Sequence, residues 1–443
     1  MAAEQLEEYA RGFMVSQVLF ASCELAVFDT LAGTPRSPSM LSDLPACPPS
    51  SQVLFASCEL AVFDALAGGP QPAEVVAARV RGSVRATRLL LDAAAALGLL
   101  QVHAGSGGAL YANSPAAAAH LTRAGPDSQR RLLGYLGGDA YRCWAHLADA
   151  VREGRSQHAR AVGVASEDPF GAIFRSESAR RRFLEAMEDA WGARGRSLLS
   201  ALGPAAWPRV CDLGGGTGAL ARLWAELHPG SHVTVLERPE VVAAAQDGGR
   251  VSFRAGDFFA DALPPADLYV LARVLHDWDD ADCARLLARV RAAGGPGAQV
   301  LVLEALLDDD GRGPLPVLLS ALTMLVQTRG RERSAPEYRA LLAAAGFHGF
   351  RCVRPGGPLA AMLAGGALEE TTGSGSAPTG SQPAPTGSES APTGSEPAPT
   401  GSDSSPTGSE PAPTGSEPDM RGSDPALTGS EPALQDVTIT DSK

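Results

Sequence analysis

The stretch W-P-R-V-C-D-L-G-G-G-T-G, residues 207–218, decides the fold. Its apolar run at 210–213 is typical of a buried strand, the strand ends at a glycine-rich turn, and residues 219–227 are predicted to form a helix. A strand, a glycine turn and a helix in this order open a doubly wound, Rossmann-like α/β sheet. The glycines allow a ligand to approach the backbone, and the N-terminus of the helix offers N–H groups to it.

The spacing of this turn favours one kind of ligand. A nicotinamide dinucleotide site reads G-x-G-x-x-G, whereas Gly214, Gly216 and Gly218 alternate with single residues here. Asp212 stands just before the turn, and a carboxylate there suits a ligand with an ammonium group better than one with a pyrophosphate. S-adenosylmethionine carries an amine and a cationic sulfur. We therefore expect S-adenosylmethionine, with a nicotinamide dinucleotide as the alternative.

Composition limits the classes of function. The chain has 443 residues, enough for two or three domains, and a net charge of −13, which argues against a nucleic-acid partner. Its seven cysteines lack a C-x-x-C pair, which indicates reduced thiols rather than disulfides or a zinc site. The acidic N-terminus is unlike a secretory signal, and no apolar run reaches the roughly 18 residues of a membrane span. We expect a soluble, cytoplasmic protein without a membrane partner.

Four regions are predicted along the chain. Residues 1–125 form a helical domain with a winged-helix pattern, which we interpret as a dimerisation domain because the acidic chain disfavours DNA binding. Residues 126–200 form a helical linker and pocket region, and residues 201–366 form the Rossmann-like domain. Residues 367–443 repeat A-P-T-G-S-E-P with few large apolar side chains, so this low-complexity tail is predicted to be disordered.

The N-terminal domain contains a duplicated block. S-Q-V-L-F-A-S-C-E-L-A-V-F-D occurs at 16–29 and again at 51–64, and the likeness extends over 16–33 and 51–68 with one difference, Thr30 against Ala65. Only one copy can occupy a given helical position in one fold, so we expect the other to be displaced or poorly packed. The first copy has the better upstream context and the second the better downstream one, which leaves the choice open.

Polar residues follow the predicted strands at 233–236 and 251–254. Ligands bind at the carboxyl ends of such strands. Glu237 lies roughly 20 residues beyond the glycine turn, where a carboxylate meets ribose hydroxyls; the alternative is a solvated acid at a strand end. After the next strand, Asp257 can accept from an adenine amino group and the Phe258 ring can cover the adenine face.

The reacting group is predicted to be His276, which follows the fourth strand at 267–272. A neutral imidazole with a pKa near its free value can take the proton of a hydroxyl that attacks a sulfonium methyl. Glu304, expected at the end of the fifth strand, and Glu332, expected in a charged turn, are available to orient the ring. A purely structural histidine is the alternative. The acidic run at 279–282 more simply charges a helix N-terminus, so no metal is expected.

Four motifs together carry a resemblance to a known family: D-L-G-G-G-T-G, G-D-F-F, L-A-R-V-L-H-D-W and L-T-M-L-V-Q-T-R-G-R-E-R. With them, the chain resembles the hydroxyindole O-methyltransferases of the cation-independent class I O-methyltransferase family, over about residues 5–365. The resemblance implies a winged-helix domain that interlocks two subunits of a homodimer, and a Rossmann-like domain that binds S-adenosylmethionine. It implies His276 as the base, flanked by Glu304 and Glu332. It also implies N-acetylserotonin as the small-molecule acceptor, methylated on its 5-hydroxyl to give melatonin.

The expected site residues come from the motifs and the resemblance. The expected cofactor contacts are Phe174, Trp191, Asp212, Gly214, Gly216, Glu237, Gly256, Asp257, Phe258 and Arg273. The expected acceptor contacts are Asp277, Thr323 and Met324. The family often has Tyr, Asp and Asn where this chain has Phe174, Glu237 and Thr323, and Thr323 puts acceptor affinity in question more than chemistry. Two rival functions remain, a phenol or hydroxyindole methyltransferase with another acceptor and a catalytically weak cofactor-binding dimer.

Overall fold

The computed structural model describes residues 3–25, 50–165, 168–203 and 207–365. The predicted tail at 367–443 and the segment between the two copies of the duplicated block lie outside the described residues. Among the described helices, none is long and apolar enough to cross a membrane.

The carboxyl-terminal half is built on an eight-stranded sheet with the order β10-β11-β8-β7-β4-β5-β6, in which β9 pairs with β8. Its central strands, from β8 to β6, run parallel, and β10 and β11 are antiparallel additions at one side. The chain passes from β4 outward to β5 and β6, then returns to place β7 on the other side of β4. This reversal creates a crevice at the carboxyl ends of the strands, where ligands bind in such sheets. The strands are β4 (Arg209–Leu213), β5 (His232–Glu237), β6 (Val251–Ala255), β7 (Leu268–Ala272), β8 (Gln299–Leu307), β9 (Arg333–Ser334), β10 (His348–Val353) and β11 (Leu359–Gly365).

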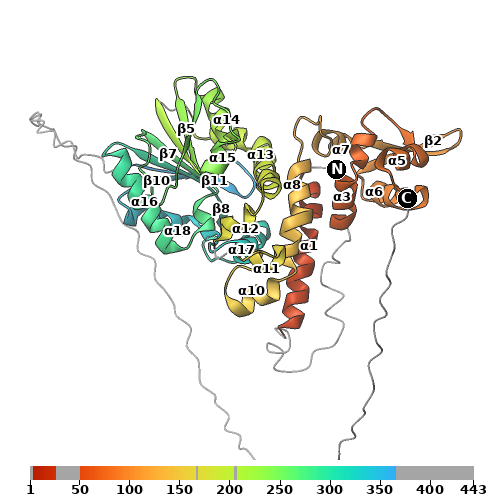
Figure 1. Ribbon diagram of the computed structural model, residues 1–443, viewed down its shortest axis with the longest axis horizontal. Helices are drawn as coiled ribbons and strands as arrows, with labels where there is room; N and C mark the ends of the chain where they lie inside the picture. The colour runs from red at the N-terminus through yellow and green to blue at the C-terminus, as the bar shows by residue number, and fades with distance from the viewer. Residues whose placement is uncertain (1–2, 26–49, 166–167, 204–206, 366–443) are drawn as a thin grey trace, which may run out of the picture. The chain divides into compact units, whose positions relative to one another are not determined.

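Helices cover both faces of this sheet (Figure 1). Alternate side chains of each strand point to opposite faces, so Val210 and Val235 pack on the side of α14, whereas Cys211 and Tyr269 pack on the side of α16 and α18. Both faces are therefore apolar, as a doubly wound sheet requires. The helix α13 (Glu177–Ser200) precedes the first strand of the sheet. The helices that follow the strands are α14 (Ala219–Leu227), α15 (Pro239–Val242), α16 (Asp280–Gly294), α17 (Leu315–Gln327) and α18 (Ala335–Ala344), with a short 3₁₀ helix, η3 (Leu275–Asp277).

Two features of the sheet differ from the sequence prediction. The fifth strand does not end at Glu304, because β8 continues to Leu307. Antiparallel β11 pairs with β8 as far as Ala305, and β9 pairs with Leu306 and Leu307 beyond it. Glu304 is therefore an interior strand residue. The strand β10 was not predicted either, because its sequence H-G-F-R-C-V has no clean alternation of apolar and polar residues.

The N-terminal part combines helices with a small three-stranded sheet of order β1-β3-β2. The strands β2 and β3 of this sheet form a hairpin, because they pair antiparallel and turn between Gly105 and Gly108. The winged-helix identity of this domain stays a prediction. The elements are α1 (Ala3–Glu24), α3 (Ser50–Glu59), α4 (Val62–Ala65), β1 (Gln71–Pro72), α5 (Ala73–Val80), α6 (Val84–Ala96), β2 (Leu100–Gly105), β3 (Gly108–Asn113) and α7 (Pro115–His120).

A run of short helices leads from this part to the sheet. It includes a π-helical turn, η2, which commonly marks a functional position. The helix α17 returns from the sheet to this part, and its Leu319 and Val326 join the core built around α1 and α3. The elements of the run are α8 (Arg130–Tyr135), η2 (Leu136–Ala140), α9 (Tyr141–Trp144), α10 (Leu147–Glu153), α11 (His158–Val162) and α12 (Pro169–Ile173).

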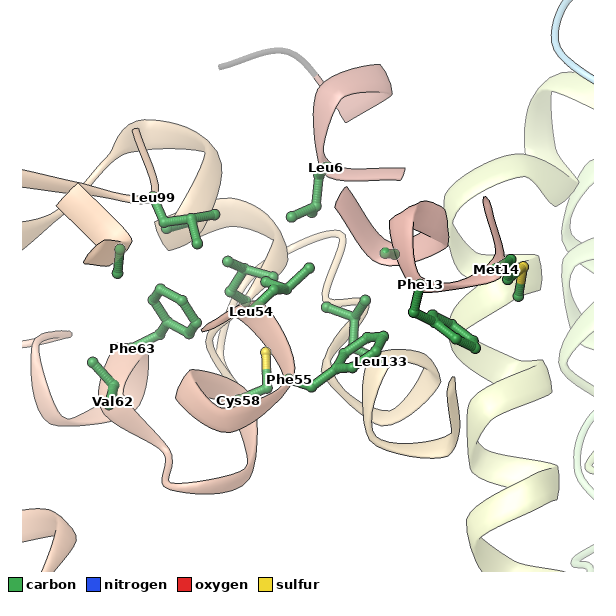
Figure 2. Packing of buried hydrophobic residues seen from close by; sticks show 14 of the residues in the cluster. Leu6, Phe13, Met14, Leu54, Phe55, Cys58, Val62, Phe63, Leu99 and Leu133 are labelled. Carbon is green, nitrogen blue, oxygen red and sulfur yellow. The ribbon is translucent and has the colours of Figure 1, made fainter. Parts of the chain in front are cut away.

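The two copies of the duplicated block have different environments. Phe55 of the second copy is 7% exposed, whereas the equivalent Phe20 of the first copy, on α1, is 59% exposed. Figure 2 shows Phe55 with Leu54 and Phe63 of the second copy in the core that α1 completes with Phe13. The sequence left this choice open, and the structure gives the packed position to the second copy.

Two residues explain why the second copy suits that position. Ala65 is buried, and the first copy has the larger, polar Thr30 there. Gly69, just after the second copy, has a φ of +117°, and the corresponding residue after the first copy is Thr34. A threonine is strained at that φ, because its branched Cβ clashes with the backbone.

Candidate active site

A cavity of about 930 Å³ opens at the carboxyl ends of the parallel strands. Residues of the helices α1, α8, α12, α13 and α17 contribute to its wall. Of the predicted site residues, Glu304 and Glu332 lie behind its wall and the others line it. The predicted residues on the wall are Phe174, Trp191, Asp212, Gly214, Gly216, Glu237, Gly256, Asp257, Phe258, Arg273, His276, Asp277, Thr323 and Met324.

The glycine turn and Glu237 form one unit at one end of the cavity, which we call the donor end because the sequence predicts the methyl donor there. Gly214 and Gly216 have φ values of 73° and 56°, which favour glycine. The backbone N–H of Gly216 donates to Glu237 Oε2 at 3.0 Å, and that of Arg238 donates to Oε1 at 2.8 Å. Glu237 is thus fixed against the turn on the cavity wall, unlike a freely solvated acid at a strand end.

Asp212 lies beneath the same turn. Its residue is 2% exposed, and neither of its carboxylate oxygens has a hydrogen-bond partner among the described residues. Burial, with a smaller contribution from the charge of Glu237, raises the pKa of Asp212 to about 7. A buried carboxylate without a donor is costly, so this wall fits a ligand that brings a positive N–H group.

An aromatic wall stands beside the glycine turn. The Phe258 and Phe259 rings are 4.8 Å apart between centroids, and Phe259 packs edge-on against Trp278 at 4.7 Å. Asp257 Oδ1 accepts the backbone N–H of Phe259 at 2.7 Å, which holds the loop and leaves Oδ2 available to a ligand. The arrangement suits a flat heterocycle with an amino group.

His276 lies at the other end of the cavity, on η3, with 3% exposure. Its Nδ1 is 3.0 Å from Glu332 Oε1 and 3.5 Å from Glu304 Oε2. Its Nε2 is 3.7 Å from Asp277 Oδ1, which is longer than a hydrogen bond. With an Nδ1–H donated to Glu332, Nε2 is the nitrogen that can accept a proton from a ligand.

The backbone around His276 is fixed by Glu304. Its Oε1 accepts the N–H groups of Val274 at 3.0 Å and of His276 at 3.3 Å. Arg273 has a φ of 55°, an unusual value for a residue other than glycine, and its N–H pairs with Leu303 O at 2.9 Å. The bend at Arg273 turns the chain from β7 into η3 and brings His276 over the sheet edge.

The charges of this cluster are strongly coupled. Burial lowers the pKa of His276, but the charges of Glu304, Glu332 and Asp277 outweigh it and raise that pKa to about 9. This corrects the expectation of a pKa near the free value. Burial opposes ionisation of Glu332, yet His276 and the hydrogen bond from Ser320 lower its pKa, so Glu332 carries the charge that pairs with the ring.

The same cluster has the spacing of a metal site. The ligand atoms of His276, Glu304 and Glu332 lie within 4.8 Å of one another. The sequence predicts no metal, and here His276 Nδ1 is already shared with Glu332. A metal ion bound to Nδ1 and Glu332 would have to displace the proton that lies between them.

Thr323 does not offer its hydroxyl proton to the cavity. Its Oγ1 accepts Trp144 Nε1 at 3.2 Å and donates to Leu319 O at 2.9 Å. Gln327, one turn further along α17, still has a donor available to a ligand. Its side chain is buried, and its Nε2 has no hydrogen-bond partner among the described residues. Its Oε1 accepts from Tyr135 Oη at 3.3 Å.

Sequence reasoning missed Gln327, Ser320 and the wall that α1 supplies. Ser320, Thr323 and Gln327 are spaced i, i+3 and i+7 on α17, a pattern that places them on one face and that could have indicated them. From α1, the side chains of Glu7 and Arg11 line the cavity, and Glu7 pairs with both Arg11 and Arg194. Nothing in the α1 sequence marks this contact, which arises only from tertiary packing.

A buried histidine and a glycine turn line one cavity on a Rossmann-like sheet, an arrangement that suits an O-methyltransferase that uses S-adenosylmethionine. Comparison with known proteins agrees. The O-methyltransferase domain matches residues 144–348, and the O-methyltransferase dimerisation domain matches residues 7–47 and 49–123. Each of the latter two segments contains one copy of the duplicated block.

Individual relatives narrow the class to one family. Mouse acetylserotonin O-methyltransferase is 53% identical over 373 residues, which cover 81% of this chain and 87% of the mouse protein. The crystal structure of human N-acetylserotonin methyltransferase in complex with SAM is 46% identical, with a TM-score of 0.72 over 76% of this chain and 99% of that one. The structure of mitomycin 7-O-methyltransferase is 27% identical, with a TM-score of 0.63 over 79% and 99%. The chain belongs to the acetylserotonin O-methyltransferase family.

Proposed function

We propose that this protein transfers the methyl group of S-adenosylmethionine to the 5-hydroxyl of N-acetylserotonin, giving melatonin. One observation carries the proposal. His276 holds Nδ1 on Glu332 at 3.0 Å and lines the same cavity as the glycine turn. The names of the mouse and human relatives support the donor and the acceptor.

The donor end fits S-adenosylmethionine through acids that form no ion pair among the described residues. Asp212 would balance the positive charge of the methionyl end, and Glu237 would accept from the ribose hydroxyls. Asp257 would accept from the adenine amino group, with Phe258 against the ring. Phe174, Trp191 and Arg273 complete the wall. Once bound, the donor supplies an electrophilic methyl on a sulfonium sulfur.

His276 is proposed as the general base. Its Nε2 takes the proton of the acceptor hydroxyl while the hydroxyl oxygen forms its bond to the methyl carbon and the electron pair of the broken bond stays on sulfur. Glu332 continues to accept the hydrogen bond from Nδ1–H, and its negative charge stabilises the imidazolium that forms. The pKa of about 9 in the free protein means that the ring is mostly protonated at neutral pH. A bound cation lowers this pKa, so donor binding prepares the base.

The acceptor is proposed to lie between His276 and α17. Asp277 is close enough to the ring nitrogen to contact a substrate hydroxyl, and Met324 supplies an apolar wall. Because the hydroxyl of Thr323 is used within the protein, Gln327 is the group on α17 best placed to meet the acetamido group.

The oligomeric state, the cellular location and the domain division of the enzyme are also proposals. The match of the dimerisation domain supports a homodimer. The free cysteines at 58, 143, 211, 283 and 352 support the expected reducing, cytoplasmic location. The four-region division of the chain, with a disordered tail, is retained as a proposal.

The test is transfer of labelled methyl from S-adenosylmethionine to N-acetylserotonin, with serotonin and a simple phenol as matched acceptors and with EDTA throughout. The proposal expects N-acetylserotonin to be preferred and EDTA to have no effect. Equal rates with a simple phenol would contradict N-acetylserotonin as the acceptor and would favour the rival function, a phenol methyltransferase. Loss of activity in EDTA, restored by a divalent cation, would assign the His276 cluster to a metal. Donor binding without transfer to any acceptor would favour the catalytically weak binding protein.

A further inference from the structure

Ser320 lies between the cavity and the residues behind His276. It sits on α17, is half-buried and lines the cavity. Its hydroxyl donates to Glu332 Oε1 at 2.6 Å, and this same oxygen accepts His276 Nδ1–H at 3.0 Å. The other oxygen, Oε2, has no hydrogen-bond partner among the described residues. One oxygen of Glu332 therefore receives both donors.

We propose that Ser320 is a positioning residue for the reaction, which acts through Glu332 to fix the imidazole of His276. This inference rests on the proposed role of His276 as the base. A carboxylate held by one donor can turn about its terminal torsion, whereas two donors on one oxygen fix its plane. With Glu332 fixed, the Nδ1–H bond sets the ring, and Nε2 keeps its direction toward the cavity.

The hydrogen bond also links two elements that are distant along the chain. Ser320 belongs to α17, and Glu332 lies in the turn before β9. Glu332 is buried, so an ionised carboxylate there depends on every donor that it receives. The carboxylate depends on Ser320 most when His276 is neutral, because the ring then contributes least positive charge. Removing the hydroxyl therefore destabilises the neutral-imidazole form more than the protonated form.

The test compares Ser320→Ala with Ser320→Thr and Ser320→Cys. Ser320→Ala is expected to lower kcat about tenfold, to leave the KM for S-adenosylmethionine unchanged and to move the acid limb of the kcat–pH profile upward. Ser320→Thr keeps the donor and is expected to restore both values. Ser320→Cys keeps the size but donates weakly, so it should behave like alanine. Ser197→Ala, an exposed serine on α13, is the control for a silent change.

Two outcomes would overturn the inference. One is a Ser320→Ala protein with an unchanged kcat and acid limb. The other is a loss confined to the KM of the acceptor, which would make Ser320 an acceptor contact. His276→Ala, assayed in parallel, separates this inference from the proposed function. If His276→Ala keeps full activity, the base assignment fails; if it is inactive while Ser320→Ala is unchanged, only the role of Ser320 fails.

Discussion

The two ends of the cavity both contain acids, but they balance the charge differently. At the donor end, Asp212 and Glu237 form no ion pair among the described residues. At the other end, which we call the base end, His276 Nδ1 lies 3.0 Å from Glu332 Oε1 and 3.5 Å from Glu304 Oε2. The protein supplies the positive charge at the base end, and the ligand must supply it at the donor end. We therefore expect the donor end to govern affinity and the base end to govern turnover.

The largest expected effect belongs to His276→Ala. Removing a general base should lower kcat by about 10² to 10⁴, while the Kd for S-adenosylmethionine should not rise, because no imidazolium remains to repel the cationic donor. Stopped or quenched-flow assay of methyl transfer, with donor affinity by calorimetry, checks both values. His103→Ala, on the exposed hairpin, is the matched control. A full rate in His276→Ala would remove the distinction between the two ends.

The next effect belongs to Glu237→Gln. The amide keeps the size but loses the charge and one of the two oxygens that accept backbone N–H groups. The bonds to the ribose and the hold on the glycine turn both weaken, so the donor Kd should rise about 10- to 100-fold. At saturating donor, kcat should stay within a few-fold of the original. Glu226→Gln, an exposed acid on α14, is the control. A fall in kcat without a change in Kd would place Glu237 in the chemical step.

Glu332→Gln sharpens the account of the base end through pH. The carboxylate of Glu332 raises the pKa of His276, so its loss should lower that pKa and move the acid limb of the kcat–pH profile downward. The expected shift is opposite in sign to that of Ser320→Ala. Both profiles are measured with saturating substrates. An acid limb that does not move would show that another group titrates.

The smallest effect is the pH dependence of donor binding at Asp212. Its pKa is about 7 in the free protein, and a bound cation favours the ionised form, so binding releases a proton. Affinity should be constant well above pH 7 and weaken by up to about tenfold per unit below it. The measurement uses the His276→Ala protein, so that titration of His276 does not contribute to the pH dependence. Asp212→Asn should abolish the dependence; a dependence that persists would belong to another acid.

The sequence located much of the site because of one topological rule. The carboxyl ends of parallel strands meet at one sheet edge, so Glu237, Asp257 and His276 were expected to lie together, and the structure brings them to one cavity. Their chemical roles stay predictions. The glycine turn was equally readable, because its positive φ values leave a signature in the residue types.

Other features depend on contacts that local patterns do not encode. Glu304 proved to be an interior strand residue because β11, distant in sequence, extends the sheet beyond it. The raised pKa of His276 needs both acids in place, and neither distance can be read from spacing. Ser320 and Gln327 escaped notice because the rest of α17 is apolar and predicts a core helix.

The duplicated block shows the same limit most clearly. Phe20 and Phe55 share identical flanking sequence, yet one is exposed and the other buried. Intrinsic propensity cannot distinguish them. The choice depends on the residues that come after each copy, including a glycine with positive φ after the second.

The most direct test of the separation between the two ends is a double-variant cycle on His276→Ala and Glu237→Gln. The measured quantity is the single-turnover kcat/KM for S-adenosylmethionine with saturating N-acetylserotonin. If one end sets turnover and the other sets affinity, the two losses multiply, with free energies that add to within about 0.5 kcal/mol. A double variant no worse than His276→Ala alone would mean that the two ends act as one unit and would contradict this account.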